Sequence, residues 1–329
     1  MADLMSARIA KSRGHKMTSS RILAVGGAHI DRRGQMTGAF VPGASIPGTM
    51  REDVGGGAFN ALRTAVQRGA NGAILSMRGG DAAGDTVARA IAAAGIVDLA
   101  AVFLDRSTPS YTALLDRGGD VVAALADMQL YEIAFPKQLR RAKMREEIAA
   151  ADAVLCDANI PAAGLQRLAM LAGDKPLFVI AISPAKVVRL IEILPALTCL
   201  YMNRREAAAL AGMGSDDTAE AVIGRLAALG LARGVITQGS GPTVGFDASG
   251  IISVRPPRPR KIADVTGAGD SLAGAMTVAL LNGAPFGEAL REGMAAALLA
   301  LESATSVPEL SSRAFAEALG LVPDTVEMR

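Results

Sequence analysis

The chain has 329 residues, half of them apolar, with only 3% aromatic residues and no Trp. Its 34 basic and 32 acidic residues give a formal net charge of +2, which argues against a nucleic-acid-binding protein, because such proteins carry a basic face or stripe. No apolar run reaches the roughly 18 residues of a membrane span, and the two cysteines, Cys156 and Cys199, form no CxxC pair, so we expect a cytoplasmic protein without disulfide bonds.

The first twenty residues carry Arg8, Lys11, Arg13 and Lys16 against a single acid, Asp3. They contain no apolar segment of the kind found in secretory signals. We interpret residues 1–20 as a disordered N-terminal extension, with a basic, serine-containing transit peptide as the alternative. A single domain is expected to follow over residues 21–329.

From Arg21 onward, short apolar runs alternate with helical patterns. This alternation is typical of an α/β fold with a doubly wound, mostly parallel sheet and helices on both faces. The predicted strands are residues 21–27, 72–77, 152–157, 177–182, 198–202 and 234–237. The predicted helices are residues 60–68, 84–94, 162–171 and 217–229.

Two segments interrupt this alternation. Residues 108–116 and 121–127 flank a Gly-Gly turn and predict a β-hairpin. Residues 34–54 are polar and rich in Gly and Pro, with no helical period. We expect strands from about 32–55 and 107–128 to form a small sheet that projects from the domain and acts as a lid over a substrate; an ordinary surface hairpin is the alternative.

The most informative segment is Asp264-Val265-Thr266-Gly267-Ala268-Gly269-Asp270-Ser271, which leads into a helical run. Its glycines let the backbone approach a ligand and turn several N–H groups toward one point, and at a helix N-terminus such donors form an anion hole. Asp270 falls in the first turn, where the helix dipole favours an ionised carboxylate. The pattern suits phosphoryl transfer, in which such a carboxylate orients and deprotonates the attacking hydroxyl group.

This segment resembles the C-terminal signature of the ribokinase-like (PfkB) carbohydrate kinase family. Further segments resemble family motifs in the same order along nearly the whole chain. The chain lacks Gly-x-x-x-x-Gly-Lys-[Ser/Thr], so a P-loop kinase is excluded. The matching segments are Gly55-Gly56-Gly57-Ala58-Phe59-Asn60, Asn203-Arg204-Arg205-Glu206 and Thr237-Gln238-Gly239-Ser240-Gly241.

The resemblance implies an ATP-dependent kinase and assigns a role to each matching position. Asp270 would be the general base, and the backbone of Gly267, Ala268 and Gly269 would stabilise the transferring phosphoryl group. ATP contacts are implied for Asn203, Thr237, Gly239 and Gly241. Glu206 and Asn203 would hold Mg²⁺ through water. A monovalent cation such as K⁺ is implied at Asp264 and the Thr266 carbonyl group, with Ser306 as a weaker third ligand.

The acceptor would bind near the N-terminal motif. Asp31 follows the first predicted strand and could accept hydrogen bonds from two sugar hydroxyl groups in the crevice of the sheet. Asn60 offers one hydrogen-bond donor group and one acceptor group. In the family these positions, with the glycine at Gly56, hold the acceptor; Asn60 alternatively caps a helix. His29 stands where the family commonly has Asn, and is either a packed residue or a partner for the sugar or base.

Within the family, the chain most resembles the pseudouridine kinases. This implies phosphorylation of the 5′-hydroxyl group of pseudouridine, with the same chemistry on ribose, another sugar or another nucleoside as the alternative, and a non-catalytic homologue as a further one. A homodimer through the lid is also implied. The short matches are Gly26 to Asp31, Ser45 to Gly48, Asp127-Met128, Ser183 to Val187, and Asp157-Ala158-Asn159-Ile160, whose Asp157 and Asn159 alternatively cap the next helix.

Overall fold

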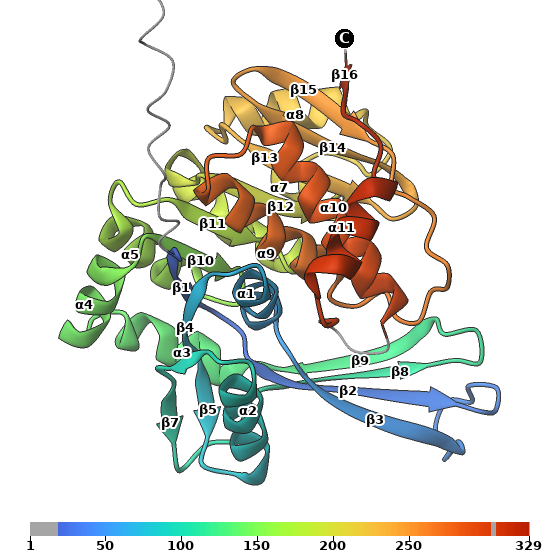
Figure 1. Ribbon diagram of the computed structural model, residues 1–329. Coiled ribbons are helices and arrows are strands. Elements are labelled where there is room, and N and C mark those ends of the chain that lie inside the picture. The colour runs from blue at the N-terminus through green and yellow to red at the C-terminus, as the bar shows by residue number, and fades with distance from the viewer. Residues whose placement is uncertain (1–18, 304–306, 329) are drawn as a thin grey trace, which may run out of the picture.

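The computed structural model describes residues 19–303 and 307–328 (Figure 1). Nearly all of the expected N-terminal extension lies outside the described residues, and so does Ser306. The predictions made for these two parts of the chain are therefore not tested by the structure.

A 10-stranded sheet forms the centre of the molecule. Its strands are β1 (Arg21–Val25), β4 (Asn71–Leu75), β6 (Val97–Asp98), β10 (Ala153–Asp157), β11 (Leu177–Ile180), β12 (Cys199–Asn203), β13 (Gly234–Gln238), β14 (Gly241–Asp247), β15 (Gly250–Val254) and β16 (Val326–Met328). The order is β16-β15-β14-β13-β12-β11-β10-β1-β4-β6, parallel from β6 to β13 and antiparallel from β13 to β16. The mostly parallel sheet is confirmed, and each predicted strand is found to within two residues.

Helices cover both faces of the sheet. Along β1, Ile22 and Ala24 belong to one hydrophobic core and Leu23 and Val25 to the other, because successive side chains of a strand point to opposite faces. The first core contains α1 (Gly57–Gln67), α2 (Ala82–Ala93), α9 (Ala268–Leu281), α10 (Phe286–Glu302) and α11 (Ser312–Leu321). The second contains α3 (Gln129–Gln138), α4 (Ala142–Ala150), α5 (Ala162–Ala172), α6 (Pro184–Val187), the 3₁₀ helix η1 (Val188–Ala196), α7 (Arg204–Ala211) and α8 (Ala219–Ala228).

A 4-stranded sheet, here called the lid, projects from the main domain (Figure 1). It consists of β3 (Gly48–Gly55), β2 (His29–Met36), β8 (Ser110–Leu115) and β9 (Val121–Asp127), in that order. The small sheet is confirmed, but β2 begins earlier than predicted, so Asp31 lies inside a lid strand rather than at the end of β1. A separate short pair is formed by β5 (Met77–Gly79) and β7 (Ala101–Phe103).

The sheet has a topological switch point beside β1. The chain places β4 on one side of β1 and later places β10 on the other, both parallel to it. In doubly wound sheets, ligands bind in the crevice outside the carboxyl ends of the strands at such a point. Gly26 and Gly27 follow β1 there, and Asp157 ends β10.

Candidate active site

A pocket of about 620 Å³ lies at this crevice. The lid contributes His29 and Asp31 of β2, Tyr111 of β8 and Ala126 of β9 to its wall, and Met128 directly follows β9. The pocket brings together predicted site residues from distant parts of the chain, namely His29, Asp31, Gly56, Asn60, Asn203, Glu206, Thr237, Thr266, Gly267, Gly269 and Asp270. The predicted residues Ala268, Asp264, Gly239 and Gly241 are not among its lining residues. Gly239 lies in the turn between β13 and β14, and Gly241 is the first residue of β14.

Helix α9 presents its N-terminus to the pocket. Gly267 caps the helix with φ +79°, a left-handed conformation that glycine adopts without strain. Ser271 N donates to Gly267 O at 2.8 Å, the first hydrogen bond of the helix. The preceding N–H groups of Ala268, Gly269 and Asp270 have no partner within the helix and are available to an anion.

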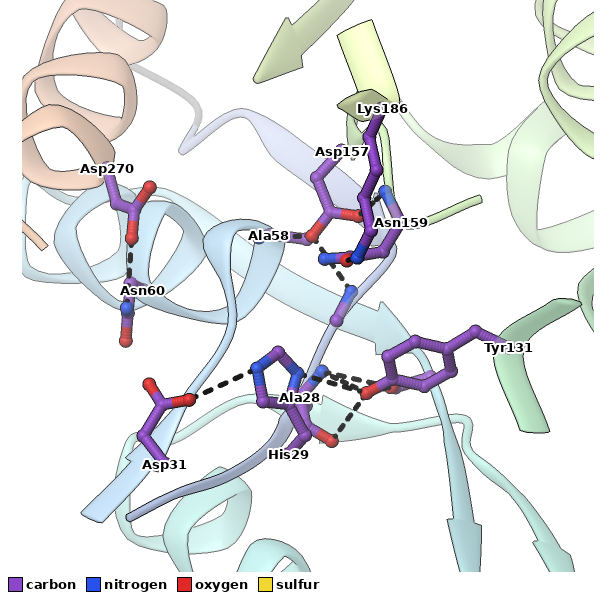
Figure 2. A network of polar contacts seen from close by, with 12 residues as sticks. Ala28, His29, Asp31, Ala58, Asn60, Tyr131, Asp157, Asn159, Lys186 and Asp270 are labelled. Atoms are coloured by element: carbon purple, nitrogen blue, oxygen red, sulfur yellow. Dashed lines mark hydrogen bonds and ion pairs between the residues drawn. The ribbon is translucent and has the colours of Figure 1, made fainter. Parts of the chain in front are cut away.

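Asp270 is joined to Asn60 across the interface of α1 and α9. Asn60 Nδ2 donates to Asp270 Oδ2 at 2.9 Å (Figure 2), while Asn60 Oδ1 is buried and has no hydrogen-bond partner among the described residues. Asn60 is not a helix cap, because α1 begins at Gly57 with Gly56 as its N-cap. Gly56 has φ +113°, and a Cβ there would stand 2.3 Å from Gly27 O, so only glycine fits.

The charge state of Asp270 differs from the sequence-based expectation. Burial raises the pKa of Asp270 to about 7; the hydrogen bond from Asn60 opposes this shift, and the charges of Asp157, Asp31 and Glu206 add to it. The expectation of an ionised carboxylate in the first turn of the helix therefore holds only above about pH 7. The group exchanges its proton near neutral pH, which is the range in which a general base is most effective.

His29 links Asp31 to the core. Its Nε2 lies 3.3 Å from Asp31 Oδ1, and its Nδ1 lies 3.3 Å from the hydroxyl oxygen of Tyr131 (Figure 2). Tyr131 is completely buried, burial raises the pKa of its phenol, and its hydroxyl group donates to Ala28 O at 3.1 Å. His29 is only 6% exposed, so it is both packed and directed at the carboxylate of Asp31.

Asn203 and Glu206 form a reciprocal cap at the start of α7. Glu206 N donates to Asn203 Oδ1 at 3.0 Å, and Asn203 N donates to Glu206 Oε2 at 2.7 Å. Burial raises the pKa of Glu206, against these capping hydrogen bonds, and the residue is only 6% exposed, so it is not a solvated helix glutamate. Within the described part of the chain, no three His, Cys, Asp or Glu side chains form a metal cluster. One buried carboxylate fits Mg²⁺ bound mainly by phosphate and water.

Asp264 is already paired with a positive charge. Thr266 N donates to its Oδ1 at 2.9 Å, and the guanidinium group of Arg33, from lid strand β2, donates to its Oδ2. Burial alone would raise the pKa of Asp264, but these hydrogen bonds and the Arg33 charge hold it below its ordinary value. Both carboxylate oxygens are engaged, so the residues present do not fit the monovalent cation expected at this position.

Sequence reasoning did not foresee the part played by Asp157. Its Oδ2 accepts hydrogen bonds from Gly27 N at 2.9 Å and Ala58 N at 3.0 Å, and its Oδ1 accepts one from Asn159 N at 3.0 Å. The alternative that it caps the next helix is wrong, because α5 begins only at Ala162 with Pro161 as its N-cap. Asp157 instead fastens the turn after β1 and the first turn of α1 to β10. Its position at the end of a buried strand was the available signal.

Two further pocket residues were missed. Lys186 is the one Lys or Arg among the described residues that line the pocket; its Nζ donates to Asn159 Oδ1 at 2.6 Å, and burial lowers its pKa.

Ile182 has φ +71°, the one positive φ outside glycine in the described ranges. A β-branched residue adopts this conformation only under strain, and such strain clusters at functional sites. A single sequence gives no signal for it.

A parallel α/β sheet with an anion-binding helix N-terminus, a carboxyl group beside it and a lid defines a small-molecule phosphotransferase of the ribokinase-like class. Residues 19–311 match the sequence profile described as pfkB family carbohydrate kinase. The chain belongs to this family and is an ATP-dependent kinase of a small-molecule substrate.

Individual relatives agree with this assignment. Pseudouridine kinase of Escherichia coli (strain K12) is 28% identical over 295 residues, covering 88% of this chain and 93% of that protein. The structure of a carbohydrate kinase from Agrobacterium tumefaciens is 44% identical, covers 94% of this chain and 100% of that chain, and has a TM-score of 0.82. Arabidopsis thaliana ribokinase, solved with ribose and ATP, shares the fold at 21% identity, 92% and 99% coverage and a TM-score of 0.80. Among the described residues, no helix is long and apolar enough to cross a membrane.

Proposed function

We propose that this kinase transfers the γ-phosphoryl group of ATP to the 5′-hydroxyl group of pseudouridine. The observation that carries the proposal is that Asp31, Asn60 and Asp270 converge on one pocket (Figure 2), although Asp270 lies 210 residues after Asn60 in the sequence. The likeness to the E. coli relative, which is named a pseudouridine kinase, supports this choice of acceptor.

The acceptor side of the pocket suits a ribose ring. Asn60 Oδ1 is a buried hydrogen-bond acceptor without a partner among the described residues, and the contact with His29 uses only one carboxylate oxygen of Asp31. These two hydrogen-bond acceptors match two neighbouring hydroxyl groups of a ribose. A buried oxygen without a partner is stabilised most when a ligand brings it a hydrogen-bond donor. His29 and Asn159 extend this polar wall beyond the ring, where a nucleoside presents the polar edge of its base.

In the proposed mechanism, Asp270 accepts the proton of the 5′-hydroxyl group as the hydroxyl oxygen attacks the γ-phosphorus of ATP. The bond from the γ-phosphorus to the bridging oxygen breaks, and ADP leaves. Asn60 holds the carboxyl group of Asp270 in position through the 2.9 Å hydrogen bond. The N–H groups at the start of α9 stabilise the charge on the transferring phosphoryl oxygens. Glu206 and Asn203 would hold Mg²⁺ through water, and Thr237 and the turn after it would contact the nucleotide. When bound, Mg²⁺ neutralises charge on the phosphate oxygens.

The same chemistry on ribose, another sugar or another nucleoside is the alternative. A panel of pseudouridine, uridine, adenosine, ribose and fructose with ATP separates these cases, with kcat/KM as the measurement. We expect pseudouridine to be preferred; turnover of a free sugar without turnover of pseudouridine would reject it. Asp270→Asn is the control for a non-catalytic homologue: it should keep nucleotide binding and lose orders of magnitude in kcat.

We further propose that two copies of the chain associate through their lids. Strand β9 pairs with β8 along one edge only, and every residue from Val121 to Asp127 is exposed. The strand is almost entirely apolar, with Leu125 70% exposed and Val121 57% exposed. A free apolar edge strand is a surface for pairing with another strand, and a second lid offers an identical one.

We also propose that the protein works in a reducing, cytoplasmic compartment. Cys156 and Cys199 are both free and buried. Burial raises the pKa of each thiol, so neither is poised to form a disulfide or to react.

A further inference from the structure

The contact between Arg33 and Asp264 joins the lid to the loop that precedes the anion-binding helix. Arg33 is the fifth residue of β2, and Asp264 lies three residues before Gly267, the N-cap of α9. The two side chains are 18% and 10% exposed, so the ion pair is largely removed from water. Arg33 Nη2 is buried without a hydrogen-bond partner in the described part of the chain, which leaves Asp264 as the recorded partner of this guanidinium group.

The position of this ion pair has an electrostatic consequence. An unpaired carboxylate at Asp264 would repel a phosphate group bound at the start of α9, and the repulsion would be strong because the site is partly shielded from water. A positive charge at Asp264 removes this penalty. By holding the carboxylate of Asp264, the charge also fixes the loop, because Asp264 Oδ1 accepts a hydrogen bond from Thr266 N, directly before Gly267.

We propose that Arg33 permanently supplies the positive charge at Asp264, so that turnover does not require a monovalent cation. Arg33 is a positioning residue: it acts through Asp264 on the loop that leads to Gly267. A K⁺ ion at the same carboxylate would face a fixed like charge and would have to displace the guanidinium group from Oδ2. The activity assay rests on the proposed pseudouridine substrate, whereas the ion pair itself stabilises the loop whatever the substrate is.

The first experiment compares kcat/KM in buffers of potassium, sodium and tetramethylammonium chloride at equal ionic strength. For the wild-type enzyme we expect no difference between the three salts. Arg33→Met should lose at least about tenfold in tetramethylammonium, because it leaves a buried carboxylate unpaired, and should regain part of the loss in potassium. Arg33→Lys, which keeps the charge, should stay independent of potassium. Arg32→Met is the matched control, since Arg32 is the neighbouring lid arginine and pairs with Glu52 away from this loop.

The second experiment measures the melting temperature of the same variants without substrate. Compared with tetramethylammonium chloride at equal ionic strength, potassium chloride should raise the melting temperature of Arg33→Met. It should leave the melting temperatures of wild type, Arg33→Lys and Arg32→Met unchanged. Potassium activation of the wild type overturns the inference, and so does an Arg33→Met enzyme whose activity and melting temperature ignore potassium. If pseudouridine is not a substrate, activity fails in every salt, while the melting temperatures still decide the role of Arg33.

Discussion

Asp270 is held between opposing influences. Burial and three neighbouring carboxylates favour its protonated form, while the hydrogen bond from Asn60 favours the ionised form, and the balance places its pKa at about 7. The sequence motif identified Asp270 as the candidate base. The pKa could not be predicted, because it depends on Asp31, Asp157 and Glu206, which only the folded chain brings near.

The first prediction concerns the pH dependence of turnover. If Asp270 is the base, kcat/KM should be level above pH 7 and fall about tenfold for each pH unit below it, because only the ionised form accepts the proton. Asn60→Leu removes a hydrogen bond that lowers the pKa of Asp270, so the midpoint should move to higher pH. A steady-state profile from pH 5 to 9 measures both; a flat wild-type profile would contradict the assignment.

The second prediction concerns stability. Because the pKa of Asp270 is higher in the folded protein than its ordinary value of 3.8, the folded state binds the extra proton and loses stability as pH rises from about 4 to above 7. Asp270→Asn should therefore melt at a temperature higher than wild type by at least about 2 °C at pH 8. The difference should shrink as the pH falls toward 4. Equal melting temperatures at pH 8 would show that burial does not disfavour the carboxylate.

Individual elements were predicted unequally well. The buried parallel strands stand out because apolar runs such as residues 153–157 end at polar or glycine residues. The start of β2 was missed because nothing in the sequence separates Ala28 from His29, and the strand is defined by pairing with β3 and β8. Likewise the contact of Arg33 with Asp264 joins residues 231 positions apart, which no local pattern reveals.

The third prediction tests the first turn of α1. Gly56→Ala would place a Cβ 2.3 Å from Gly27 O at a residue with φ +113°, and should cost about 1–3 kcal/mol or more of unfolding free energy. Gly224→Ala is the matched control, because this glycine lies within α8 with open space around it. This substitution should leave the unfolding free energy unchanged or raise it by about 0.5–1 kcal/mol. Urea unfolding gives both values. A Gly56→Ala variant as stable as wild type would mean that the close approach to Gly27 is not required.

The fourth prediction belongs to the whole molecule. If the lids pair, light scattering at micromolar concentration should give the mass of a dimer, and Leu125→Lys in β9 should shift it toward the monomer by placing a charge on the apolar strand. Leu104→Lys is the control, since Leu104 is 88% exposed but lies outside the four lid strands. A wild-type monomer would refute the proposed dimer, and equal effects of the two substitutions would remove β9 from the interface.

The site is divided between the two ends of the chain, and this affects when an active enzyme can first exist. During synthesis the residues of β1, the lid and α1 leave the ribosome early, and the main sheet grows outward on both sides of β1. The partner of Asn60 lies 210 residues later, in α9. If Asp270 is the base, a nascent chain that ends before α9 has the proposed acceptor-binding residues without it, so no copy can phosphorylate an acceptor until α9 has been made.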